Sequence, residues 1–249
     1  MNSRRQRTTN SIQALVDVAS AQLPREIVGE TDAVLPELVC SGLLSRQIEL
    51  AESVMDLGQR PTDSSKAILI RSLFDHAVTM VWIAAEDSAD RVRRFQKTDA
   101  IRRLEIEKDA QRLGESFLSP EVKQDLEAQV ETLPSGMPDL KQRADQADGY
   151  WVGKIPGLGQ NPASTYLGLY AFAYRNHSTL EHASRMGLNA VIDDAGKGRK
   201  LVHLEVLDLR KHGPLGQASI LLGLSLLVLS ARFGWPEQQL VLDAFEAET

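Results

Sequence analysis

Apolar residues recur along most of the chain at the three-to-four-residue spacing of an α-helix. Proline, glycine and capping residues separate these stretches, as they do at the ends of helices. The pattern predicts helices over residues 9–23, 36–57, 65–86, 89–113, 119–133, 139–147, 162–187, 213–231 and 236–247. We therefore expect a mainly α-helical bundle of about eight helices, forming a single domain over residues 1–249 with a frayed N-terminus of about eight residues.

Two of the predicted helices are apolar on nearly every side. Residues 65–86 carry ionisable side chains only at the two ends and in a small central cluster, and residues 213–231 carry none. A helix that is apolar all round belongs in the centre of a protein. The second stretch also approaches the length of a membrane span, but proline, glycine, serine and glutamine interrupt it. We expect a buried core helix and no membrane association.

The segment after the predicted helix over 162–187 changes from helical to alternating spacing. Residues 188–192 and 201–207 flank Asp193-Asp194-Ala195-Gly196-Lys197-Gly198, a turn-forming sequence. This favours a small β-hairpin near 188–207. Residues 149–160 are rich in glycine and predict a loop, from which Tyr150 and Trp151 would cover a neighbouring surface.

Composition narrows the cellular context and the class of partner. The chain has 249 residues, a net charge of −6 and one cysteine, Cys40. A single cysteine allows no disulfide within the chain, which is typical of a reducing cytoplasm. The acidic balance argues against a protein whose whole surface binds nucleic acid, although a local basic groove remains compatible with it.

Three ionisable residues interrupt the apolar helix over 65–86. Arg71 and Asp75 are four residues apart, so they can form an ion pair on one face, and His76 follows directly. Charges are costly inside an apolar helix even when paired. The cluster therefore indicates either a ligand contact or a structural ion pair that anchors a neighbouring segment.

A second polar cluster lies inside the apolar helix predicted over 162–187. Tyr174, Ser178 and His182 follow one another every four residues, and Arg175 precedes His182 by seven, nearly two helical turns. The arginine fork suits phosphate, and the imidazole can move a proton near neutral pH. Together with Asn176, these groups suit cleavage of a phosphodiester by a ribose 2′-hydroxyl.

Plainer interpretations of the same residues stay open. His182 can simply bond a neighbouring segment, and Arg175 can pair with Asp75. A metal site from Asp75, His76, His177 and His182 is conceivable, but the paired Glu-x-x-His motifs of di-iron bundles are missing. Phosphate-binding loops, dinucleotide motifs and the Gly-x-Ser-x-Gly nucleophile turn are absent as well. We expect no metal and no cofactor.

The pattern Arg175-Asn176, five residues, then His182 resembles the signature of HEPN ribonucleases. The resemblance implies a helical bundle, often a homodimer, whose motif helices face each other. It also implies metal-independent RNA cleavage in toxin–antitoxin or phage-defence systems. By this resemblance, Arg175 and His182 are catalytic and Asn176 supports them.

A longer part of the chain, roughly residues 68–183, resembles a bacterial family of uncharacterised helical proteins. The resemblance rests on Arg71 with Asp75 in one helix, the run over 91–95, and Tyr174-x-x-x-Ser178-x-x-x-His182 in a later helix. It implies where a site lies rather than what the site does.

We therefore expect a HEPN-like endoribonuclease with RNA as substrate and, in a toxin or defence system, a cognate antitoxin or defence partner. His182, Arg175 and Asn176 would be catalytic. The supporting residues would be Tyr174, Ser178, Arg71, Asp75 and His76. The alternative is a non-enzymatic helical sensor or partner-binding module with a pocket for a small anionic ligand. The acidic net charge favours this alternative, whereas a basic rim near His182 would favour the nuclease.

Overall fold

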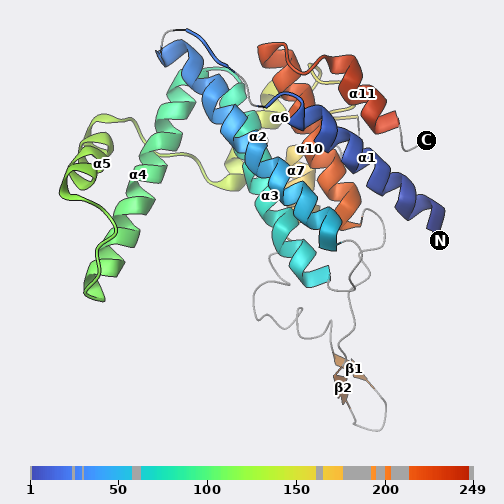
Figure 1. Cartoon of the computed structure of the whole chain (residues 1–249), viewed down its shortest axis with the longest axis horizontal. Helices are drawn as coiled ribbons and strands as arrows, with labels where there is room; N and C mark the ends of the chain where they lie inside the picture. Colours follow the sequence, from blue (N-terminus) through green and yellow to red (C-terminus); the bar gives the residue numbers. More distant parts are fainter. Residues whose placement is uncertain are drawn as a thin grey trace.

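The structure is a computed structural model, and it describes residues 2–23, 26–29, 31–57, 63–160, 165–175, 192–194, 200–202 and 213–246. The mainly α-helical bundle predicted from the sequence is confirmed (Figure 1). The long helices are α1 (Asn2–Ser20), α2 (Thr31–Leu57), α3 (Asp63–Ala84), α4 (Ser88–Arg112), α5 (Pro120–Thr132), α6 (Leu140–Trp151), α10 (Pro214–Phe233) and α11 (Gln238–Glu246).

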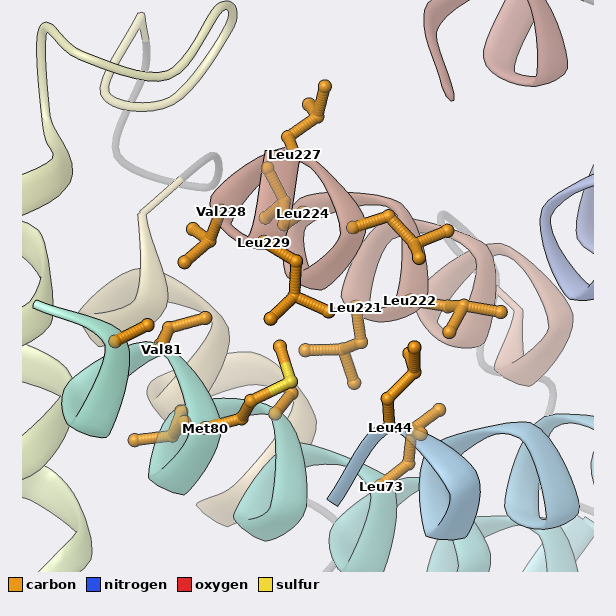
Figure 2. Packing of buried hydrophobic residues seen from close by; sticks show 14 of the residues in the cluster. Leu44, Leu73, Met80, Val81, Leu221, Leu222, Leu224, Leu227, Val228 and Leu229 are labelled. Atoms are coloured by element: carbon orange, nitrogen blue, oxygen red, sulfur yellow. The ribbon is translucent and has the colours of Figure 1, made fainter. Parts of the chain in front are cut away.

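Helix α3 is the centre of the bundle, as its all-round apolar pattern predicts. It packs against α2 and α10, and the layer between α3 and α10 is filled by leucine, valine and methionine side chains (Figure 2). Phe74 and Trp82 are among its largest fully buried side chains, and burial of such a side chain contributes about 1.5–3 kcal/mol. One side of α3 stays open to solvent, because Ile68 is 46% exposed and Arg71 and Asp75 are half-buried.

Helix α10 has the boundaries that its sequence predicts. Pro214 occupies the first turn, where the missing amide hydrogen costs nothing. Gly234 ends the helix in the left-handed conformation, with φ of 76°, which glycine adopts without strain. The nine residues from 221 to 229 are all buried, which confirms the predicted core helix.

Residues 65–84 of α3 and all of α10 are long and apolar enough to cross a membrane by length and composition alone. Both are mostly buried inside the bundle, and buried core helices pass the same test. The expected cytoplasmic location and absence of a membrane stay predictions.

Helices α1 and α2 begin earlier than the sequence pattern predicts. The apolar face expected on α1 is confirmed, because Ile12, Leu15, Val16 and Ala19 are all buried, but its helix starts at Asn2. Helix α2 starts five residues before Pro36 and contains it. Near a helix start, a proline costs at most one backbone hydrogen bond, so it does not fix the boundary.

Helices α4 and α5 project from one side of the bundle (Figure 1), and α5 packs on α4. The hydroxyl of Ser119 accepts a hydrogen bond from the Val122 amide and caps α5, which agrees with the helix predicted to begin near residue 119. Helix α4 starts at Ser88, one residue before the predicted start, and Asp87 rather than Ser88 is its N-cap residue. The Ser88 hydroxyl instead donates to the Ala85 carbonyl at 2.8 Å.

Helix α6 is longer than predicted and extends into the expected loop. Asp139 and Gln142 form a capping box at its start. Its last residue, Trp151, was expected in an exposed loop, but it is 3% exposed and its indole nitrogen donates to the Val81 carbonyl at 2.9 Å. The apolar ring therefore anchors α6 to α3, because both its surface and its single donor are satisfied there.

The helix expected over 162–187 is described only in its first part. Helix α7 (Tyr166–Leu169) begins after Thr165 and continues into a π-helix, η2 (Tyr170–Arg175). Asp148 fixes this start, because its carboxylate accepts the Tyr166 and Leu167 amides, each at 2.8 Å. Beyond it, β1 (Ile192–Asp194) pairs antiparallel with β2 (Lys200–Val202); the rest of 188–207 lies outside the described residues.

Candidate functional site

An aromatic cluster holds the described part of the motif helix against α3. The rings of Tyr170 and Tyr174 stack with centroids 5.2 Å apart and an interplanar angle of 16°. Phe74 of α3 contacts both of these rings, at 6.2 and 5.9 Å. Both tyrosines belong to η2, and π-helical turns occur frequently at functional sites.

Arg71 of α3 meets Tyr174 through two interactions. The guanidinium lies 4.8 Å from the centre of the tyrosine ring, and its Nη2 donates to the tyrosine oxygen at 3.1 Å. Since the oxygen accepts from Arg71, the tyrosine keeps its own hydrogen for another acceptor. None of the hydrogen bonds among the described residues uses that hydrogen.

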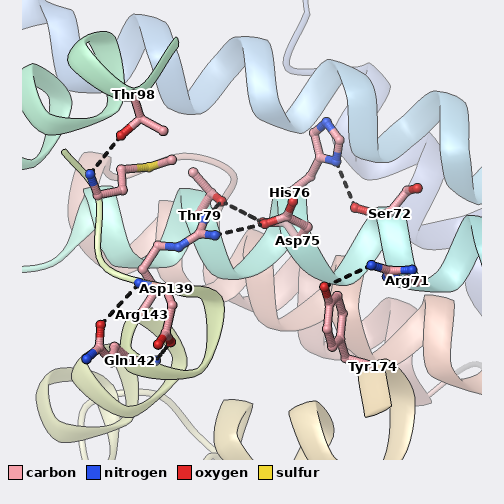
Figure 3. Close-up of polar contacts among 11 residues, drawn as sticks. Arg71, Ser72, Asp75, His76, Thr79, Thr98, Asp139, Gln142, Arg143 and Tyr174 are labelled. Atoms are coloured by element: carbon pink, nitrogen blue, oxygen red, sulfur yellow. Dashed lines mark hydrogen bonds and ion pairs between the residues drawn. The ribbon is translucent and has the colours of Figure 1, made fainter. Parts of the chain in front are cut away.

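Asp75 forms its ion pair with Arg143 of α6, at 3.2 Å (Figure 3). Arg143 also donates to the Thr79 hydroxyl, and that hydroxyl donates to the Asp75 carbonyl at 2.7 Å. Among the described residues Asp75 therefore does not pair with Arg71, four residues earlier, as the helical spacing suggested. The alternative pairing with Arg175 stays a prediction, because the side chain of Arg175 lies outside the described residues. Spacing along one helix could not reveal a cation that comes from another helix.

The two partners of this ion pair differ in burial, and this affects the pKa of Arg143 and the accessibility of Asp75. Arg143 is 5% exposed, and this burial lowers the pKa of its guanidinium, an effect that the nearby Asp75 carboxylate opposes. The side chain of Asp75 is 45% exposed, and only its Oδ1 faces Arg143. Asp75 is thus held in place through one oxygen while much of its carboxylate stays accessible.

Two open hollows lie beside this network. The smaller, of about 210 Å³, is lined by Ile68, Arg71, Ser72, Asp75 and Tyr174. The larger, of about 390 Å³, is lined by residues of α3, α4 and η2 together with residues 137–140 and Arg143. Asp75 and Tyr174 line both, so the hollows are neighbours at the end of the motif helix that the structure describes.

The outer wall of the larger hollow is held by hydrogen bonds to α4 and α6 (Figure 3). The Thr98 hydroxyl accepts from the Met137 amide at 2.8 Å and donates to the Arg94 carbonyl at 3.0 Å. Asp139 follows as the cap of α6, accepting from the Gln142 amide at 2.8 Å. The wall is therefore formed before any ligand arrives.

His76 lies apart from the two hollows and lines neither. Its Nδ1 bonds the Ser72 carbonyl at 2.7 Å, and Figure 3 shows its ring pointing away from Tyr174. A carbonyl can only accept, so Nδ1 carries the hydrogen. The contact stays within α3 and satisfies the ring locally.

The structure brings together three of the predicted site residues, namely Arg71, Asp75 and Tyr174. The backbone of Arg175 ends η2, whereas its side chain and all of Asn176, Ser178 and His182 lie outside the described residues. The prediction that they form one site with Arg71 and Asp75 stays a prediction. Within the described ranges, no group of three or more metal-binding side chains occurs.

Sequence reasoning missed Arg143 and Arg102, which both line the larger hollow. A signal for Arg143 was present, because it shares the buried face of α6 with Ala147 and Trp151 at intervals of four residues. A cation on such a face needs a buried partner. Arg102 is exposed on α4 among many other charges and carries no comparable signal.

Comparison with known proteins places the chain in a family. A family model described as a family of unknown function, DUF5677, matches residues 37–199, which is well over half of the chain. The matched range begins inside α2, at residue 37, and runs beyond η2, so it includes every described residue of the two hollows. No curated protein and no solved structure matches the chain.

Proposed function

The chain belongs to DUF5677, a family of unknown function, and we propose that it is a HEPN-like endoribonuclease that needs no metal. The sequence element behind the proposal is Arg175-Asn176 followed, after five residues, by His182. As the resemblance implies, it would act as a homodimer in a toxin or phage-defence system, where an antitoxin or other defence protein would control it.

One structural observation supports the proposal most. An open hollow with Arg71 and the hydroxyl of Tyr174 on its wall lies directly beside the start of this motif. A guanidinium and a hydroxyl with a free hydrogen are both donors that suit phosphate oxygens. Asp75 on the same wall is paired with Arg143, which offsets its repulsion of an anion.

The proposed reaction is attack of a ribose 2′-hydroxyl on the adjacent phosphorus. The bond from O2′ to phosphorus forms, and the bond from phosphorus to O5′ breaks. His182 takes the proton of the 2′-hydroxyl and returns a proton to the leaving O5′. Arg175 stabilises the charge that develops on the phosphorane oxygens, while Asn176 and Ser178 orient the reacting groups. The products are a 2′,3′-cyclic phosphate and a 5′-hydroxyl.

Arg71 and Tyr174 position the phosphate in this mechanism. Tyr174 is fixed on one side by Tyr170 and held at its oxygen by Arg71. Both groups come from well-packed helices, so they keep their places when the substrate binds. Asp75 fixes the approach of α6 through Arg143.

The test is incubation of the purified chain with labelled total RNA in EDTA. We expect cleavage by the wild type and at least a hundredfold slower cleavage by His182→Ala and by Arg175→Ala. The matched control is His212→Ala, which removes a histidine outside the motif and should cleave normally. Cleavage that survives in both motif variants, or that the wild type never shows, contradicts the proposal.

The second candidate function is a non-enzymatic module that binds a small anion. Three arginines, Arg71, Arg102 and Arg143, line the adjoining hollows of an otherwise acidic chain. Such a module would bind inorganic phosphate or a nucleotide and leave RNA intact. An arginine-dependent affinity without any cleavage would favour it over the nuclease.

A further inference from the structure

The larger hollow has no role in the cleavage chemistry, yet it adjoins the hollow in which the phosphate would bind. Its volume of about 390 Å³ falls within the range of roughly 300–1,000 Å³ that is typical of small-molecule sites. Because Asp75 and Tyr174 line both hollows, a group bound in the larger one is a direct neighbour of the phosphate.

The wall of this hollow combines apolar surface with both kinds of hydrogen-bonding group. Met137, Pro138 and Leu140 supply the apolar part, Arg102 supplies donors, and the carboxylates of Asp75 and Asp139 supply acceptors. A nucleobase has the complementary chemistry, with apolar faces and an edge that carries donors and acceptors. A free phosphate would use only the arginines.

Asp75 is built to present one acceptor to this hollow. Its Oδ1 accepts hydrogen bonds from the Arg143 guanidinium at 3.2 Å and from the Thr79 hydroxyl at 3.5 Å. No hydrogen bond among the described residues reaches its Oδ2. The buried Arg143 therefore fixes the side chain through one oxygen and leaves the other for a ligand.

Arg102 is the accessible donor on the wall of this hollow. It is exposed on α4, and none of the ion pairs among the described residues includes it. Arg143, by contrast, is committed to Asp75 and Thr79. Within the described part of the chain, a ligand in the hollow thus meets the unpaired guanidinium of Arg102. It also meets two carboxylates, of Asp75 and Asp139, each with hydrogen bonds to one oxygen only.

We propose that this hollow binds the base next to the cleaved phosphate and that it prefers guanine. The guanidinium of Arg102 donates to O6 and N7, the commonest specific contact of arginine with a base. The free oxygen of Asp75 accepts from N1–H and the N2 amino group on the adjoining edge. Adenine has an acceptor at N1 that would face the carboxylate, and uracil has no amino group. This inference rests on the proposed function, because it names the base that the nuclease selects.

The experiment is calorimetric titration of the wild-type chain with the 5′-monophosphates of guanosine, adenosine, cytidine and uridine. These compounds contain no scissile bond, so binding is measured without cleavage. We expect guanosine monophosphate to bind about tenfold or more tightly than the others, since a good bidentate contact contributes about 1–3 kcal/mol of discrimination.

Asp75→Asn is the decisive variant. The amide keeps an oxygen for Arg143 and Thr79 but presents an NH₂ group, a donor, to the hollow. Affinity for guanosine monophosphate should fall about tenfold, with little change for the other three. Asp109→Asn makes the same charge change at an exposed site on α4 and should change nothing. Arg102→Ala, at an exposed position that does not support the fold, should also lower the affinity for guanosine monophosphate about tenfold.

Equal affinity for all four nucleotides, no binding of guanosine monophosphate, or unchanged affinity in both Asp75→Asn and Arg102→Ala would overturn the inference. RNA cleavage decides the proposed function separately. If the chain cleaves RNA but binds the four nucleotides equally, the nuclease proposal is supported and the guanine site is contradicted. If the chain binds guanosine monophosphate through Asp75 but never cleaves RNA, the guanine site is supported and the nuclease proposal is contradicted.

Discussion

At the scale of single residues, the polar side chains of the two hollows are held by partners that come from other helices. Arg71 of α3 holds Tyr174 of η2, and Arg143 of α6 holds Asp75 of α3. These four residues of the two hollows are therefore fixed by partners that are distant in sequence. Such pre-positioning is what a binding or catalytic site requires.

Tyr174→Phe tests the hydroxyl that faces the smaller hollow. The change removes one hydrogen-bonding group and keeps the stacked ring, so the fold should be little affected. We expect RNA cleavage to slow about tenfold, which corresponds to roughly 1.4 kcal/mol and the contribution of one good hydrogen bond.

Tyr170→Phe is the matched control for this variant, because Tyr170 stacks on Tyr174 but does not line either hollow. Cleavage rates of the two variants are compared under identical conditions. An equal effect of both substitutions would mean that the tyrosines act through packing alone.

Glu107 is a buried carboxylate that stabilises the connection between α4 and α5. It is 2% exposed and accepts from the Ser116 hydroxyl, the Phe117 and Leu118 amides and the Gln111 side chain. These hydrogen bonds, that from Ser116 above all, lower its pKa from 4.5 to about 2. The charged form is therefore favoured by folding.

Because the pKa of Glu107 is depressed in the folded state, its contribution to stability is present above pH 4.5 and is lost as the pH falls towards 2. Glu107→Gln should melt at a lower temperature than the wild type at pH 7, and the difference should shrink between pH 4.5 and pH 2. Thermal unfolding followed by circular dichroism measures this.

Glu105→Gln serves as the control for the pH series, since Glu105 is exposed on the same helix. Its melting temperature should follow the wild type at every pH. A constant difference between wild type and Glu107→Gln across the acid range would show that the carboxylate is not the titrating group.

At the scale of helices, packing follows what the apolar pattern predicts, while boundaries follow individual contacts. Gly223 of α10 lies where α11 crosses, and a Cβ at this position would overlap the ring of Phe245. Gly223→Ala should therefore destabilise the fold by about 1–3 kcal/mol, a typical cost of overpacking. Chemical denaturation gives the free energy of unfolding directly.

Gly216→Ala is the control on the same helix, because a Cβ added at this position would meet no atom within 4 Å. Alanine is the better helix former by about 1 kcal/mol, so this variant should be unchanged or more stable. If Gly223→Ala were as stable as Gly216→Ala, α11 would not pack on α10 through Phe245.

The sequence predicted helices well where one face or all faces are apolar. The buried face of α1 and the burial of residues 221–229 in α10 follow from spacing alone. The π-helix at Tyr170–Arg175 has no such signal, because its apolar spacing fits an α-helix equally well. Trp151 was misplaced because glycine-rich sequence after it indicated a loop, whereas its indole is satisfied by Val81 of α3.

The candidate site was predictable in its residue types but not in its pairings. Arg71, Asp75 and Tyr174 stand out as polar groups on apolar helices, and the structure brings them together. The partner of Asp75 depends on how α6 crosses α3, which no local pattern encodes. Arg102 lines the larger hollow, and this too depends on how the helices cross rather than on a local pattern.

At the scale of the whole molecule, charge is distributed unevenly. The chain has a net charge of −6, yet Arg71, Arg102 and Arg143 all line the two adjoining hollows. Asp75 and Asp139 line the same hollows and Asp75 pairs with Arg143, so the positive charge there exceeds the negative charge only slightly. A local excess of this kind on an acidic protein favours a specific anionic ligand over non-specific binding along a polyanion. In the proposed nuclease, this concentrates substrate contacts at the motif helix.

The most direct measurement of the central claim is the chemistry of the cut ends. A synthetic RNA is incubated with the chain in EDTA, and the products are identified by mass spectrometry. The proposed mechanism predicts 2′,3′-cyclic phosphate and 5′-hydroxyl ends from the wild type and from His212→Ala, and intact RNA from His182→Ala. Intact RNA with the wild type, or the same products from His182→Ala at the wild-type rate, would contradict the claim.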